Sequence, residues 1–135
     1  MSNHTLLQPQ EIEVFYIIPN LRKEFAISMI LQGLKQNKIA ELLHVESATV
    51  SQYINEKRGN KIELDDNIKK EITISASRIR DSLSLVGETQ RLLRLIRSSG
   101  NLCRIHKQLS DVPRECEPKL INCFGEKNGN ARVCY

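Results

Sequence analysis

Four side chains in the last third of the chain have the chemistry of metal ligands: Cys103, His106, Cys116 and Cys123. Cys103 and His106 are three residues apart, so on a helix they share one face and can touch one ion. Two later thiolates would complete a tetrahedral zinc site, and thiolates are also the usual ligands of iron–sulfur clusters. Because paired C-x-x-C elements are missing, two alternatives stay open: thiols with a redox role, or cysteines with no ligand role at all.

A second group of side chains has the chemistry to read nucleic-acid bases. Small or uncharged side chains are concentrated between residues 47 and 52, namely Ser47, Ala48, Thr49, Ser51 and Gln52. On the outer face of a helix, such side chains reach base edges in a major groove without steric conflict. Gln52 is the best single candidate for base readout, because its amide can pair bidentately with adenine.

Two short helices joined by a tight turn must position this polar face. Helical periodicity predicts the first helix over about residues 36–43 and the second over about residues 47–55. A steep crossing needs a small residue on the first helix, which Ala40 supplies. The residues predicted to fill the joint are Ile39, Leu43, Val45, Val50 and Ile54.

This segment, residues 34–59, resembles the lambda-repressor-like helix-turn-helix of the XRE type. The family pattern Q-x-x-I-A-x-x-L-x-V-x-x-x-x-V-S-x-Y-x-x-x-K-R is matched by Gln36, Ile39, Ala40, Leu43, Val45, Val50, Ser51, Tyr53, Lys57 and Arg58. The chain departs from the family at His44, where Gly in a left-handed conformation is common. A His at this position needs a positive φ or a different turn.

The resemblance implies a sequence-specific, double-stranded DNA-binding transcription regulator, and it assigns roles position by position. Gln36 is expected to contact the phosphate backbone or to support the reading helix. Base-facing positions are Ser47, Ala48 and Gln52, with Thr49 and Ser51 near them. Phosphate-holding positions are Tyr53, Asn55, Lys57 and Arg58.

A wider stretch, from about Pro9 to Cys116, is similar to archaeal predicted transcription regulators with a Cys-bearing C-terminal region. The corresponding pieces are EVFYIIPNLRKE, VSQYINEKRG and IRSSGNLCRIHK. The first piece contains Pro19, which we expect to interrupt or restart a helix. This similarity covers most of the chain.

The pattern of the whole chain predicts an all-α fold in three parts. Residues 1–64 form the helix-turn-helix domain, residues 65–110 a helical dimerisation region, and residues 111–135 an irregular Cys-containing tail. Asp65 or Asp66 caps the first helix of the second part. Homodimerisation is expected because this part carries more apolar side chains than one short domain needs: Leu83, Leu85, Val86, Leu92, Leu95, Ile96 and Leu102.

The distribution of charged residues does not identify which segment would attract the DNA phosphates. The formal net charge is +4, but acids and bases nearly cancel through the predicted helix-turn-helix. Arg91, Arg94 and Arg97 recur every three residues on one side of a helix. Such a row either forms a solvated face, which we favour, or clamps flanking phosphates.

Other classes of function are disfavoured. A signal peptide and a run of apolar residues long enough to span a bilayer are both missing, so a cytoplasmic protein is expected. An enzyme is not expected, because the pair Cys103 and His106 has no carboxylate obviously placed to orient the imidazole. The alternative to DNA binding is a metal- or thiol-dependent module that contacts another protein of the transcription machinery.

Overall fold

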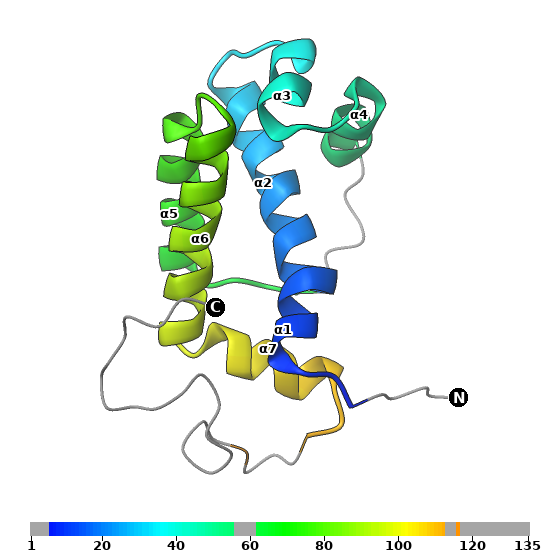
Figure 1. The fold of residues 1–135 in the computed structure, drawn as a ribbon, viewed down its shortest axis with the longest axis vertical. Coiled ribbons are helices and arrows are strands. Elements are labelled where there is room, and N and C mark those ends of the chain that lie inside the picture. Colours follow the sequence, from blue (N-terminus) through cyan, green and yellow to red (C-terminus); the bar gives the residue numbers. More distant parts are fainter. Residues whose placement is uncertain (1–5, 56–61, 113–115, 117–135) are drawn as a thin grey trace.

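The computed structural model describes residues 6–55, 62–112 and 116, and helices dominate this part of the chain (Figure 1). The elements are α1 (Pro9–Ile12), η1 (Glu13–Ile17), α2 (Ile18–Leu31), α3 (Gln36–Leu43), α4 (Ser47–Asn55), α5 (Asp66–Arg78), α6 (Ser82–Ser98) and α7 (Asn101–Leu109). The described residues contain no strand, which confirms the all-α class for them. None of these helices combines the length and apolar character needed to cross a membrane.

Pro19 changes the type of the first helix without ending it. Proline has no N–H, and its ring collides with the preceding turn of an α-helix. The chain accommodates it with η1, a single wider π-turn in which the Ile18 N–H donates to the Glu13 carbonyl oxygen. The interruption expected at Pro19 therefore takes this form, and α1, η1 and α2 follow one another without a gap.

The other helices pack around α2. Leu21, Phe25 and Met29 are spaced by four residues along it and are completely buried, so they form a continuous apolar stripe. α3, α4 and α5 contact α2, while α6 packs against α5, and α7 packs against α1 and α6. Figure 1 places α3 and α4 at one end of the long axis and α1 and α7 at the other.

One hydrophobic core joins the N-terminal helices to α5, α6 and α7. Phe25 of α2, Ile72 of α5 and Ile96 of α6 belong to the same buried cluster. This cluster spans the predicted boundary between residues 64 and 65. The helices on both sides of that boundary are therefore packed together through their apolar faces.

The apolar residues that suggested a dimer interface lie mostly inside this core. Leu92, Ile96 and Leu102 are completely buried, while Leu85 and Leu95 pack partly buried against the cluster. Leu83 and Val86 are exposed. Most of these apolar side chains are thus buried within one chain, and among them only Leu83 and Val86 remain exposed for a partner.

Local signals define the helix ends. Asp65 caps α5, where its carboxylate accepts from the Ile68 N–H at 3.0 Å, and Asp81 caps α6 by accepting from the Ser84 N–H at 2.8 Å. After α2, Gly33 has a φ of 97°, a conformation that side chains disfavour. Residues 62–64, which precede α5, have no regular secondary structure.

Candidate functional site

The turn between α3 and α4 adopts a left-handed conformation at His44. Its φ is 58° and its ψ is 45°, so the first of the two possibilities predicted for this position is the one found. The Val45 N–H donates to the Ala40 carbonyl oxygen at 3.0 Å, which closes the end of α3. The chain then reaches α4 within three residues, so the two helices must cross at short range.

The predicted apolar residues fill the joint between α3 and α4. Ile39 and Val50 are completely buried, and Leu43 is nearly so. Ala40 is also buried, as expected for a small residue where two helices approach closely. The remaining predicted members, Val45 and Ile54, are partly buried against the same core. One side of α4 is therefore fixed to the rest of the molecule by apolar packing.

The opposite side of α4 is exposed and carries no charge. Ser47, Ala48, Gln52 and Asn55 are exposed, and every side chain of α4 is uncharged at neutral pH. Three other predicted positions are only partly exposed, and these are Thr49, Ser51 and Tyr53. The outer surface of α4 thus offers short hydrogen-bonding groups on a rigid helix.

Two side-chain hydrogen bonds link α3 to α4. The Gln36 Nε2 atom donates to Ser51 Oγ at 2.8 Å, so Gln36 supports α4, which is one of its two predicted roles. Ser47 Oγ donates to Asn37 Oδ1 at 3.2 Å. The Asn37 contact was not predicted from the sequence, although the position of Asn37 beside Gln36, in the first turn of α3, indicates that it lies near α4. We call α3, α4 and the turn between them the α3–α4 pair.

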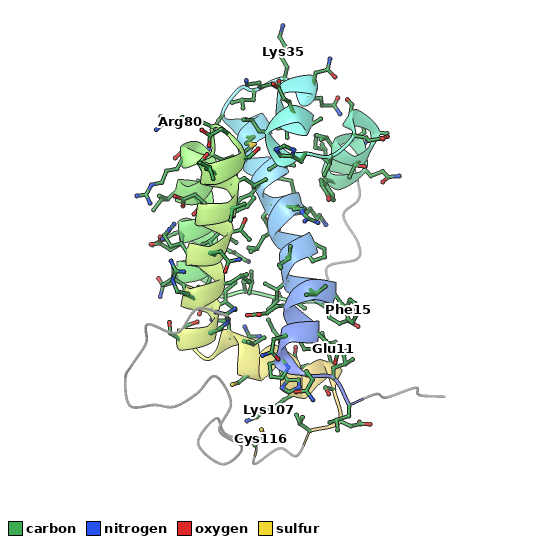
Figure 2. The ribbon with its side chains drawn as sticks, viewed as in Figure 1. Glu11, Phe15, Lys35, Arg80, Lys107 and Cys116 are labelled. Atoms are coloured by element: carbon green, nitrogen blue, oxygen red, sulfur yellow. The ribbon has the colours of Figure 1, made fainter. Side chains whose placement is uncertain are left out.

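The charged side chains of the α3–α4 pair come from α3 and the two loops beside it. These side chains are Lys35, Lys38, Glu41 and Glu46, and all are exposed. Their formal charges cancel, because two are positive and two are negative. Lys35 occupies the N-cap of α3, and its ammonium cannot accept a hydrogen bond from the first N–H groups of the helix. Figure 2 shows Lys35 extending outward from this end of the molecule. A helix start with this composition favours an anion.

Arg91, Arg94 and Arg97 were predicted to form either a solvated face or a clamp for phosphates. Arg97 does neither, because its side chain is buried. Its Nε atom donates to Glu13 Oε2 at 2.7 Å and its Nη2 atom to Glu13 Oε1 at 3.1 Å. Only 8% of the Arg97 side chain and 6% of the Glu13 side chain are exposed. Two parallel hydrogen bonds between buried opposite charges hold α6 to η1, so Arg97 is neither solvated nor free for phosphate.

Arg91 is also an internal partner, whereas Arg94 is exposed as predicted. The Arg91 Nη1 atom donates to Glu71 Oε1 at 2.7 Å, and its Nε atom donates to Glu88 Oε1 at 3.2 Å. Burial raises the pKa of Glu88, but hydrogen bonds from Ser75 and Arg91 outweigh burial and hold it below its usual value. The basic character of α6 is therefore mostly neutralised inside the molecule.

The predicted metal ligands are only partly described. Cys103 and Cys116 are half-buried free thiols, and His106 is buried with its Nε2 atom donating to the Leu7 carbonyl oxygen. Burial, together with the charge of nearby Cys116, raises the pKa of Cys103, which disfavours the thiolate that binds metal. Among residues 6–55, 62–112 and 116, no three His, Cys, Asp or Glu side chains form a group that could hold an ion. Cys123 lies outside these residues.

Two predicted phosphate contacts, Lys57 and Arg58, also lie outside the described residues, directly after α4 in sequence. The structure thus brings together Gln36, Ser47, Ala48, Gln52 and Asn55 at one end of the molecule. It places His106 at the other end, on α7 (Figure 1). Comparison with known proteins gives no match to a family model, to a curated protein or to a solved structure.

Proposed function

We propose that this protein binds double-stranded DNA as a sequence-specific transcription regulator, with the α3–α4 pair acting as a lambda-repressor-like helix-turn-helix. The observation that carries the proposal is the outer face of α4. Ser47, Ala48 and Gln52 are exposed there, while Val50 on the opposite side is completely buried. A rigid helix with short, uncharged groups on its free face has the chemistry required for direct readout in a major groove.

Two exposed positions of α4 are assigned base contacts in this proposal. The Gln52 amide pairs with N6 and N7 of an adenine, and the Ala48 methyl group contacts a thymine methyl. The start of α3 lies on a phosphate, where its N–H groups and the ammonium of Lys35 face the negative charge. Gln36 keeps α3 and α4 together through Ser51 while both touch the duplex.

Phosphate attraction then has few sources. Arg91 and Arg97 are engaged with glutamates, so their charges add little to an external field. Exposed cations at this end of the molecule include Lys35, Lys38 and Arg80. Lys57 and Arg58 follow α4 in sequence. With few phosphate contacts, the dependence of affinity on salt is expected to be modest in slope. Binding as a homodimer to two half-sites about 34 Å apart would double the number of contacts.

The test is selection of bound duplexes from a random pool by the purified full chain, followed by titration of a selected duplex at several salt concentrations. The proposal expects a recurring sequence and an affinity that falls with salt. Affinity for no duplex, or equal affinity for every duplex, would contradict it. Retention of a protein partner at high salt without duplex binding would favour an interaction module instead.

Gln52→Ala tests the assignment of base readout. Losing one bidentate pair should reduce discrimination between the selected duplex and its single-base variants by about 1–3 kcal/mol. Gln108→Ala is the matched control, because Gln108 is an exposed glutamine on α7 at the other end of the molecule. The assignment is wrong if both variants discriminate as the wild type does.

A further inference from the structure

His44 makes a contact that its backbone position does not require. A glycine would take a φ of 58° at lower cost, because it has no Cβ. The His44 side chain instead reaches across to α6, where its Nε2 atom lies 2.8 Å from Ser82 Oγ, within hydrogen-bonding distance. This contact joins residues that are 38 positions apart in the chain.

The other residue of this contact, Ser82, lies at the start of α6, where capping hydrogen bonds fix the backbone. Ser82 is the first residue of α6. The preceding residue, Asp81, caps the helix, and the Ser84 hydroxyl accepts in return from the Asp81 N–H at 2.9 Å. Reciprocal bonds of this kind fix the first turn of a helix. Ser82 is therefore held in place by the α5–α6 connection independently of His44.

The contact also differs in direction from the other polar contacts of the α3–α4 pair. The bonds Gln36–Ser51 and Asn37–Ser47 stay within the pair. The His44–Ser82 contact leaves it and reaches α6, which packs against α5 and also contacts α3. Apolar packing by Ile39 and Val50 holds the pair to the core but is non-directional. A hydrogen bond, being directional, also restricts the orientation of the α3–α4 pair relative to α6.

We propose that His44 is a positioning residue: through Ser82 it fixes the orientation of α4 on the helical body and thereby sharpens discrimination among duplex sequences. This inference rests on the proposed DNA-binding function. His44 itself touches no base in this scheme. The contact limits how far the α3–α4 pair can rotate relative to α6. Gln52 is then held in a single orientation toward its base pair.

The experiment measures Kd for a selected duplex and for a scrambled duplex of the same length, with the wild type, His44→Gly, Ser82→Ala and the double variant. Each single variant should lower the ratio of the two affinities by about three-fold to ten-fold, the value of one hydrogen bond. The double variant should lose no more than either single variant, since both remove the same contact. Ser82→Thr keeps the hydroxyl and should keep the wild-type ratio.

Stability separates positioning from a merely structural role. His44→Gly removes the contact but relieves the left-handed side-chain conformation, so its midpoint of thermal unfolding should stay near that of the wild type while its discrimination falls. Ser98→Ala, an exposed serine at the other end of α6, is the matched control.

Several outcomes overturn the inference. Unchanged discrimination in both single variants, or additive losses in the double variant, would refute positioning by this contact while leaving the proposed function intact. A wild-type chain that binds no duplex would refute both. Loss of discrimination in Ser82→Thr equal to that in Ser82→Ala would also refute it, because the hydroxyl would then be irrelevant.

Discussion

The two ends of the molecule both carry polar side chains, but these side chains are buried at one end and exposed at the other. Around α7, the side chains of Glu13, Arg97 and His106 are buried and bonded to partners far away in sequence. At the α3–α4 end, Gln52 lies exposed on a helix whose other side is apolar. Buried polar groups must be satisfied internally, so their hydrogen-bonding capacity is used within the fold. Exposed groups on a rigid helix keep their hydrogen-bonding capacity for an external partner.

The largest effect is expected where the buried pair is broken. Arg97→Met leaves the Glu13 carboxylate buried without its main partner and should lower the free energy of unfolding by about 3–5 kcal/mol. Denaturant unfolding measures this. Arg94→Met, an exposed position on the same helix, is the matched control and should change stability little. Duplex binding by the folded fraction of Arg97→Met should equal that of the wild type.

The double variant Glu13→Leu with Arg97→Met sharpens this result. Replacing both charges by apolar side chains removes the unpaired carboxylate, so most of the lost stability should return. If the double variant is less stable than Arg97→Met alone, the destabilisation does not come from an uncompensated charge.

A smaller effect is expected at His106, which links α7 to the segment before α1. His106→Ala removes the shorter of the two hydrogen bonds that the Leu7 carbonyl oxygen accepts, the other coming from Ser110 Oγ at 3.4 Å. It should cost about 1–2 kcal/mol of unfolding free energy, because the oxygen keeps only the weaker partner. The Leu7 amide, which donates to Ser110 Oγ at 2.7 Å, should exchange faster with solvent. The exposed neighbour Lys107→Ala serves as the control; equal stability of the two variants would contradict the link.

At the opposite end, one hydrogen bond is expected to matter less for stability. Ser51→Ala removes the acceptor of the Gln36 amide in a half-buried position, and about 0.5–1.5 kcal/mol of unfolding free energy should be lost. Ser77→Ala, an exposed serine of α5, is the control. A loss as large as that of Arg97→Met would contradict the contrast between the two ends.

The sequence predicted the α3–α4 end well because its signals are local. Ile39, Leu43 and Val50 repeat at helical spacing, both helices begin where this spacing indicated, and α3 also ends there. The left-handed turn at His44 was one of the two possibilities that the family resemblance left open for this position.

The other end was predicted poorly because its contacts are distant in sequence. Glu13 and Arg97 are 84 residues apart, and no periodicity in α6 indicates which carboxylate meets Arg97. Likewise, the spacing of Leu92 and Ile96 identified an apolar face but not the helices that cover it. An apolar face covered within the chain and an apolar face exposed for a dimer have the same sequence pattern. Only the packing of the helices distinguishes the two.

The smallest expected effect concerns the acid stability of the α6 start, which anchors the contact to His44. Hydrogen bonds from Ser84 hold the pKa of Asp81 below its usual value of 3.8. The stabilisation by the ionised cap is therefore fully present above that value and is lost as the pH falls through the lower pKa of the folded state. Asp81→Asn keeps a capping oxygen but does not titrate, so its midpoint of thermal unfolding should fall less than that of the wild type between about pH 5 and about pH 2. Asp66→Asn, an exposed acid in the first turn of α5, is the control. An identical acid dependence in Asp81→Asn and the wild type would show that the cap is not what stabilises this end.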